Sequence, residues 1–153
     1  MTNTNHVTCR PALASERLAL EDLQRRASLG NPNDREALLS HPEAIELPLE
    51  QILAGHVFLV ERDGATVGFA AVLPRDDGNS ELDALFVDPD FWKQGLGRLL
   101  VEHCAGIAKM RGSAALHVIG NPHAEGFYRA CGFEQIGTVQ TRFGVGLLFR
   151  RPL

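Results

Sequence analysis

The chain has 153 residues, of which 44% are hydrophobic and 22% charged, a composition typical of a globular domain with its own core. Its formal net charge of −4 gives no electrostatic reason to expect a nucleic acid as a partner. No apolar run approaches the ~20 residues that cross a membrane, and residues 1–10 lack the apolar segment of a signal peptide. We therefore expect one soluble, cytoplasmic domain over residues 1–153. The three cysteines, Cys9, Cys104 and Cys131, have no disulfide or metal-ligand spacing and are expected to be reduced thiols.

Hydrophobic spacing and turn residues predict the elements of the first half of the chain. These are a strand at 7–10, a helix at 12–29, a short helix at 34–39, and strands at 56–62 and 66–73. Asp63-Gly64, between the last two strands, is a strong hairpin signal. Residues 40–55 carry two prolines and no regular pattern. We expect them to form a loop that either shapes a substrate site or only connects its neighbours.

The second half begins with a strand at 81–87 and continues through a long amphipathic helix. The predicted elements are that strand, a helix at 96–112, a strand at 115–119, a short helix at 124–131, and strands at 133–139 and 146–150. The order βααβββαβαββ predicts an α/β fold, with a mixed sheet and helices on its faces.

The stretch Trp92-Lys93-Gln94-Gly95-Leu96-Gly97-Arg98 joins a strand to the long helix. Two glycines at the entry to a helix let backbone N–H groups approach an anion, and the helix dipole adds favourable potential. Lys93 and Arg98 add positive charge. This pattern predicts a pyrophosphate site, although such glycines can also serve packing alone. The absence of Gly-Lys-Ser/Thr disfavours a nucleoside-triphosphate loop, and the absence of GxGxxG disfavours a dinucleotide fold.

A second motif, Asn121-x-x-Ala124-x-x-Phe127-Tyr128-x-x-x-Gly132-Phe133, follows a strand and spans the next helix. With the glycine loop it resembles the acyl-CoA binding core of the GNAT superfamily of N-acetyltransferases. The resemblance covers residues 56–153 well and the earlier residues only through the order of their elements. It implies a single domain with a mixed, mostly antiparallel sheet flanked by helices. It also implies a splay between the fourth and fifth strands.

The resemblance assigns residues to the coenzyme, acetyl-CoA. In the family the loop has the form Gln/Arg-x-x-Gly-x-Gly/Ala and its amides hold the pyrophosphate. This implies contacts from Trp92, Lys93, Gln94, Gly95, Leu96, Gly97 and Arg98, where Trp92 departs from the usual Gln or Arg. The backbone of Leu85, Phe86 and Val87 is implied to bond the pantetheine arm, and the Val87 N–H to face the thioester oxygen. Asn121, Phe127 and Tyr128 complete the implied coenzyme site. Asn121 could instead cap a helix, and Phe127 is expected to pack toward the sheet.

Three residues are candidates for the chemistry. Tyr128 is implied to protonate or stabilise the leaving thiolate, the alternative being a tyrosine that only packs with its hydroxyl in water. Glu81 and Asp83 lie two apart on one strand and therefore share a face. A partly buried carboxylate can take a proton from the attacking ammonium, and in several family members a glutamate at the position of Glu81 does so. Alternatively, both are solvated. His117 and His123 could act as proton relays, but we interpret both as structural.

These observations predict an enzyme that moves an acetyl group from acetyl-CoA to a primary amine by direct attack in a ternary complex, without a metal. The acceptor would be a small-molecule or peptide amine, and the sequence does not identify it. A homodimer is compatible with the family. Two other functions stay open, a non-catalytic acyl-CoA-binding sensor and a nucleotide-binding module. The latter would be stabilised by ATP rather than by acetyl-CoA.

Overall fold

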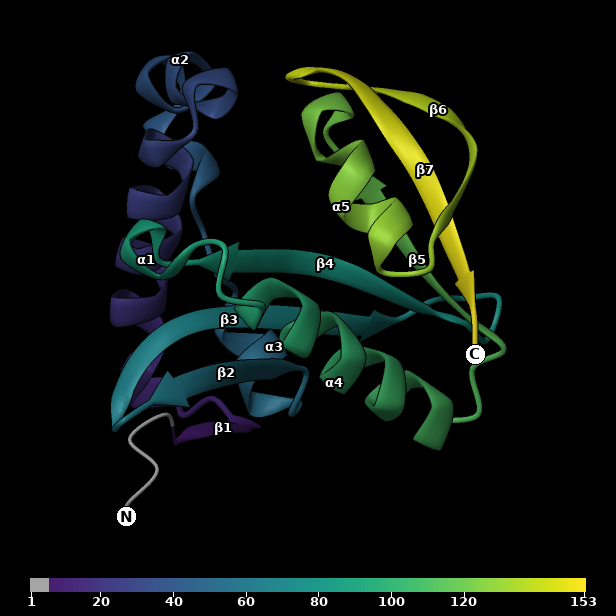
Figure 1. The fold of residues 1–153 in the computed structure, drawn as a ribbon, viewed down its shortest axis with the longest axis horizontal. Coiled ribbons are helices and arrows are strands. Elements are labelled where there is room, and N and C mark those ends of the chain that lie inside the picture. Colours follow the sequence, from purple (N-terminus) through teal and green to yellow (C-terminus); the bar gives the residue numbers. More distant parts are fainter. Residues whose placement is uncertain (1–5) are drawn as a thin grey trace. The chain divides into compact units, whose positions relative to one another are not determined.

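A computed structural model describes residues 6–153. Its seven strands form one mixed sheet in the order β1-β2-β3-β4-β5-β7-β6 (Figure 1). The β4–β5 pair is parallel, whereas the β1–β2, β2–β3, β5–β7 and β6–β7 pairs are antiparallel. The strands are β1 (Val7–Pro11), β2 (Val57–Arg62), β3 (Ala65–Pro74), β4 (Ser80–Val87), β5 (Ala115–Gly120), β6 (Glu134–Thr141) and β7 (Gly144–Pro152). The predicted mixed, mostly antiparallel α/β fold is confirmed.

The described residues also form five α-helices and four 3-10 helices. The α-helices are α1 (Arg17–Gly30), α2 (Pro32–Ser40), α3 (Leu49–Leu53), α4 (Leu96–Met110) and α5 (Glu125–Ala130). The 3-10 helices are η1 (Ala14–Glu16), η2 (Pro42–Ala44), η3 (Pro89–Phe91) and η4 (Pro122–Ala124). Helix α3 corrects the prediction of an irregular segment at 40–55. Only one residue of α3, Ile52, is buried, so the segment has no periodic apolar pattern that would predict a helix.

The chain divides into two compact units. The first unit contains residues 6–71 and 84–100, and the second contains residues 72–83 and 101–153. Strands β3 and β4 and helix α4 each contribute one segment to either unit. No helix among residues 6–153 is long and apolar enough to cross a membrane.

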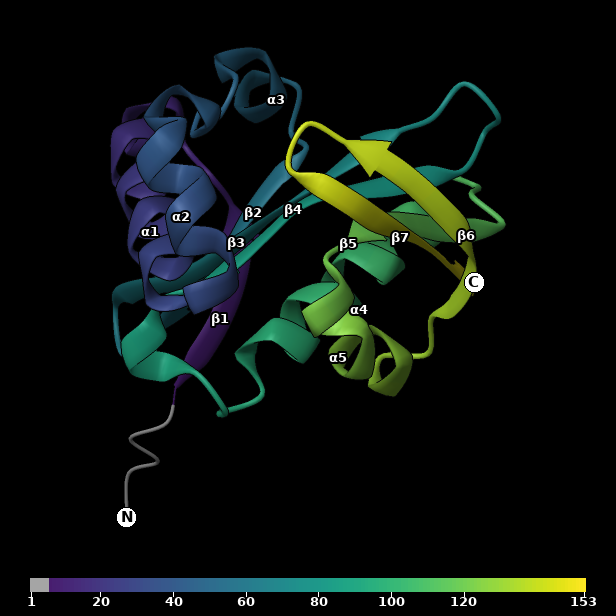
Figure 2. The same cartoon turned by 90° about the horizontal axis from the view of Figure 1, so that it is seen from above.

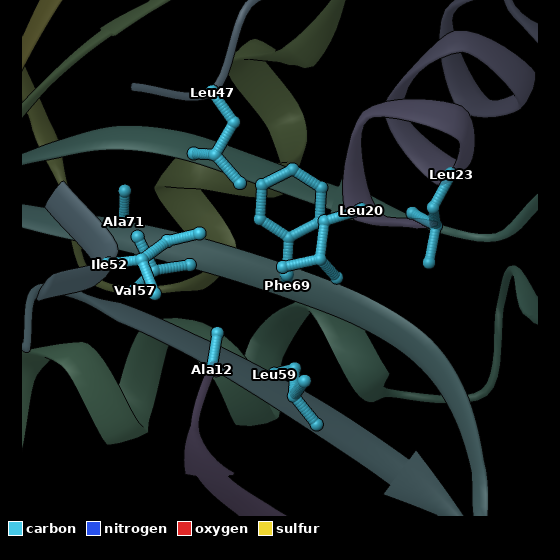
Figure 3. Close-up of a cluster of buried hydrophobic side chains, with 9 residues drawn as sticks. All are labelled: Ala12, Leu20, Leu23, Leu47, Ile52, Val57, Leu59, Phe69 and Ala71. Atoms are coloured by element: carbon cyan, nitrogen blue, oxygen red, sulfur yellow. The ribbon is translucent and has the colours of Figure 1, made fainter. Parts of the chain in front are cut away.

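The core of the first unit lies between α1 and strands β2 and β3. Leu20, Leu23 and Ala27 recur three and four residues apart, so they line one side of α1, and all three are buried. Figure 3 shows the ring of Phe69, from β3, beside Leu20. Helix α2 lies next to α1 on the same side of these strands (Figure 2). Burial of apolar side chains such as these supplies most of the favourable free energy of folding.

The hairpin that joins β2 to β3 is confirmed. Asp63 and Gly64 both have positive φ, 52° and 85°, the backbone shape of the two-residue turns whose twist matches paired strands.

The second unit packs α5 against β5 and β7. Tyr128 of α5 lies 5.3 Å from Phe149 of β7 and 5.6 Å from Phe133, measured between ring centroids. A buried hydrogen bond of 2.8 Å joins the hydroxyls of Ser80 and Ser113 and satisfies both polar groups.

Strands β4 and β5 pair only briefly. Their register holds two pairs, Ser80 with Leu116 and Glu81 with His117, although β4 continues to Val87 and β5 to Gly120. The predicted splay corresponds to this end of pairing after Glu81. Backbone groups that a neighbouring strand does not use can bond an extended ligand.

We expect Gly68→Ala to destabilise the protein by about 1–3 kcal/mol, the usual cost of overpacking. A Cβ at Gly68 would lie 2.9 Å from the Phe86 carbonyl oxygen, which is backbone and moves only if β4 moves. Urea unfolding measures the change. Gly126→Ala, in α5 with nothing within 4 Å of the added carbon, is the matched control and should not destabilise. Equal stabilities of the Gly68 and Gly126 variants would contradict this account of β3.

Candidate active site

The loop between η3 and α4 has a backbone suited to anion binding. Lys93 and Gly95 have φ of 64° and 81°, a left-handed conformation that is uncommon for a residue such as lysine. The first N–H groups of an α-helix have no intrahelical acceptor, and in α4 these belong to Leu96, Gly97 and Arg98. Beyond Gly95 and its two neighbours along the chain, no atom lies within 4 Å of a Cβ placed on Gly95. The approach to these donors is therefore open at Gly95.

The loop side chains divide into two kinds. The Trp92 indole Nε1 donates to the Val87 carbonyl oxygen at 2.7 Å, and Gln94 accepts a hydrogen bond from Arg62 of β2. Trp92 and Gln94 are exposed, but each makes a hydrogen bond within the protein. Lys93 and Arg98 are exposed and supply positive charge.

The segment 85–87 lies at the end of β4, in the first unit, and Leu85, Phe86 and Val87 are all half-buried. Just beyond it, the Asp88 N–H donates to the Val67 carbonyl oxygen at 2.8 Å. The Asp88 carboxylate accepts the Asp90 N–H at 3.0 Å and the Arg26 guanidinium at 2.8 Å. The chain leaving β4 is therefore bonded to both β3 and α1.

Tyr128 is the most buried of the candidate residues in the second unit, with 9% of its surface exposed. Its ring passes so close to Gly120 that a Cβ there would lie 2.8 Å from the Tyr128 Cε2 atom. Sequence reasoning missed Gly120, and the unexplained glycine at the end of a strand was the available signal. Burial of the hydroxyl raises the pKa of Tyr128 to about 12. The phenol is therefore protonated at neutral pH.

The structure corrects the expected packing of Phe127 and one alternative role of Asn121. Phe127 is 37% exposed and meets Tyr128 edge-on at 5.2 Å, so the prediction that it packs toward the sheet is wrong. Neighbouring helical positions point about 100° apart, and Tyr128 takes the inward direction. Asn121 stands at the start of η4, but its side chain makes no capping hydrogen bond, which contradicts the capping alternative.

Of the two candidate carboxylates, only Glu81 is partly enclosed. Its Oε1 accepts a hydrogen bond from Arg75 Nη1 at 3.0 Å, and 30% of its side chain is exposed. Asp83 is exposed. A surface hollow of about 450 Å³ lies in front of Glu81 and is lined by Pro74, Arg75, Asp76, Asp77 and Glu81.

His117 is held by Asn79. The Asn79 Oδ1 accepts the N–H groups of Ala114 and Ala115 at 3.0 and 3.2 Å, which turns its amide nitrogen toward His117 Nε2, 3.4 Å away. The hydrogen-bond network thus assigns the neutral tautomer with its proton on Nδ1. Burial, and then the charge of Arg75, lower the pKa of His117. This supports the structural interpretation of His117. His123 is exposed.

The structure therefore groups the predicted site residues in two sets. The loop and the end of β4 (85–87 and 92–98) belong to the first unit. Glu81, Asp83, Asn121, Phe127 and Tyr128 belong to the second.

The fold has close counterparts among solved structures. The PaiA N-acetyltransferase of Thermoplasma acidophilum, in complex with coenzyme A, superposes with a TM-score of 0.77 at 15% identity over 97% of this chain and 99% of that one. The class of fold is thus that of the N-acetyltransferases.

The sequence comparisons name the family. A profile of the acetyltransferase (GNAT) family matches residues 19–133, and the chain belongs to this family. The amino-acid acetyltransferase of Shewanella oneidensis is 30% identical over 106 residues, which are 67% of this chain and 23% of that protein. The peptidyl-lysine N-acetyltransferase YjaB of Salmonella typhimurium is 43% identical over 56 residues, 37% of each protein. The matched regions thus span well under half of these two relatives.

We expect the one tyrosine of the chain to titrate near pH 12 in the folded state and near the ordinary value, about 10, in urea. Because the pKa is raised on folding, Tyr128 stabilises the fold fully below pH ~10, and this contribution is lost as the pH rises through ~12. It amounts to roughly 2–3 kcal/mol. Tyrosinate absorbance follows the titration, and urea unfolding of wild type and Tyr128→Phe between pH 8 and 12 isolates the stability term. A folded-state midpoint near 10 would contradict the buried hydroxyl.

Proposed function

We propose that the chain is an enzyme that transfers an acetyl group from acetyl-CoA to a primary amine. The observation that carries the proposal is the loop ahead of α4. It holds two left-handed residues, Lys93 and Gly95, next to the first N–H groups of the helix, and the space beside Gly95 is open to a ligand. Such a backbone suits a pyrophosphate. Family membership supports the acyl-CoA assignment over a nucleotide.

In this proposal the coenzyme is held mainly by backbone groups. The amides of residues 93–98 bond the pyrophosphate, and the charges of Lys93 and Arg98 add to the helix dipole. The end of β4, at Leu85, Phe86 and Val87, bonds the pantetheine amides. Asn121 and Phe127 are also proposed to contact the coenzyme.

The proposed reaction is a direct attack. Glu81 takes a proton from the acceptor ammonium, directly or through water, and the free amine attacks the thioester carbon. Glu81 is preferred to Asp83 because only Glu81 is partly enclosed. A new C–N bond forms, and the Val87 N–H donates to the oxyanion that develops. The C–S bond then breaks, CoA leaves as a thiolate, and the extra proton that the attacking nitrogen still carries passes to solvent water, which leaves a neutral amide.

Tyr128 is proposed to donate a hydrogen bond to that leaving sulfur. With a pKa raised to about 12, it holds its proton more strongly than a thiol, whose ordinary pKa is about 8.5. Hydrogen-bond donation is therefore favoured over full proton transfer. A neutral, desolvated donor stabilises charge as it develops and stays protonated through the cycle.

The acceptor is proposed to be a small-molecule or peptide amine. The relatives named above act, by their names, on an amino acid and on peptidyl lysine. The net charge of −4 and the carboxylates around the hollow at Glu81 favour a cationic acceptor.

Tyr128→Phe should keep the ring packing and the affinity for CoA while turnover falls about tenfold or more, because only the donor to the leaving group is removed. Release of CoA thiol with a panel of amines measures turnover, and calorimetry measures affinity. Unchanged turnover would remove Tyr128 from the chemistry. CoA binding by wild type with no turnover on any amine would instead favour a sensor.

Gly95→Val should weaken CoA binding about tenfold or more, because a branched side chain blocks the anion and its left-handed backbone resists substitution. Gly112→Val is the matched control. Gly112 also has a positive φ, 87°, and open space, but it follows the far end of α4. We expect Gly112→Val to bind CoA with wild-type affinity. Equal affinities for the two variants would place the pyrophosphate elsewhere.

A further inference from the structure

Trp92, the one tryptophan of the chain, is 40% exposed but is tied to the first unit by two contacts. Its indole N–H donates to the Val87 carbonyl oxygen at 2.7 Å. Its ring lies against the backbone of α1 at Gly30. A Cβ there would lie 3.3 Å from the Trp92 Cη2 atom and 3.1 Å from Pro89 Cγ. The missing side chain of Gly30 thus forms a notch that accepts Trp92 and Pro89.

A second contact joins α1 to the same segment. Arg26 lies four residues before Gly30, so both are on one side of α1. Its Nη2 donates to Asp88 Oδ2 at 2.8 Å, while Asp88 Oδ1 accepts the Asp90 N–H at 3.0 Å. One carboxylate therefore caps η3 and ties it to α1.

Together these contacts hold the peptide between Val87 and Asp88 from both sides. Its carbonyl oxygen is bonded by Trp92, and its N–H donates to the Val67 carbonyl oxygen of β3 at 2.8 Å. The direction in which the chain leaves β4 is fixed before any ligand arrives. The left-handed Lys93 follows directly after Trp92, and such a conformation persists only where its surroundings hold it.

We propose that Trp92 is a positioning residue that holds the pyrophosphate loop in its binding conformation, using Val87 and the Gly30 notch as supports. The proposal rests on the proposed function and goes beyond it. It makes the C-terminal end of α1, at Arg26 and Gly30, part of the support of the coenzyme site. It also accounts for tryptophan where related loops have glutamine or arginine, because the indole N–H is used inside the protein and not on phosphate.

The first test measures CoA binding by calorimetry. Trp92→Phe keeps an aromatic ring for the notch but removes the N–H, and should raise the Kd for CoA about three- to tenfold, the equivalent of one ordinary hydrogen bond. Trp92→Gln restores the residue type usual in the family and should bind more weakly still, because glutamine does not fill the notch. A Trp92→Gln variant that binds CoA as tightly as wild type, or more tightly, would overturn the proposal.

The second test changes only α1. Gly30→Ala and Arg26→Met should each raise the Kd for CoA about threefold or more, although neither residue is assigned a contact with the coenzyme. The matched controls are Gly106→Ala, in α4 with nothing within 4 Å of the added carbon, and Arg25→Met, which removes a 4.0 Å ion pair with Asp22. Both controls should bind CoA as wild type does. Binding of CoA by Gly30→Ala and Arg26→Met at wild-type affinity would overturn the proposal.

Two readouts separate positioning from simple loss of stability. In Gly30→Ala and Arg26→Met the KM for acetyl-CoA should rise while kcat at saturating acetyl-CoA and the KM for the amine stay at wild-type values. Fluorescence of the one tryptophan should become more accessible to acrylamide in Gly30→Ala without ligand and return toward the wild-type value at saturating CoA. A fall in kcat with unchanged KM would overturn the positioning role. Absence of CoA binding to wild type would overturn the proposed function itself, whereas equal binding by all variants overturns only this inference.

Discussion

The peptide between Val87 and Asp88 is the constraint on which the loop between η3 and α4 depends. Both of its polar groups are bonded inside the first unit, to Trp92 and to β3. Because both hydrogen bonds of this peptide are made, the chain that follows β4 continues in one fixed direction. The loop that follows can then carry a left-handed lysine and a left-handed glycine without the freedom to relax. Preorganisation of this kind lowers the entropy lost when a ligand binds.

In the second unit the comparable constraint is the burial of one phenol. The Tyr128 ring is enclosed by Phe133, Phe149 and the bare backbone of Gly120. Burial of the phenol favours its neutral form, so the pKa rises and the proton stays in place. The packing of the Tyr128 ring thereby sets the pKa of its hydroxyl. The same ring contacts fix where the phenol oxygen lies.

The end of strand pairing distinguishes the two carboxylates of β4. Glu81 is opposite His117 in the last β4–β5 pair and is braced by Arg75, whereas Asp83 lies beyond the pairing and is exposed. Two residues that share a strand face thus differ in environment. His117 is braced as well, because the Asn79 oxygen is committed to two backbone N–H groups and its nitrogen must face the ring. Paired and braced side chains lose little further entropy when a substrate arrives.

Local patterns in the sequence determined most of the elements, the Asp63-Gly64 hairpin, the glycine loop ahead of α4 and the Asn121 to Phe133 motif. Each depends on residues that are close along the chain, where propensity, periodicity and turn chemistry act. Tertiary structure alone decided that Trp92 turns back to Val87 and Gly30, that Tyr128 rather than Phe127 faces the sheet, and that Gly120 makes room for it. Tertiary structure also decided the short helix α3, because a segment with one buried residue has no apolar periodicity that predicts a helix. The physical reason is common to all four: each depends on contact, or its absence, with atoms far away in sequence, and a one-dimensional pattern carries no information about such atoms.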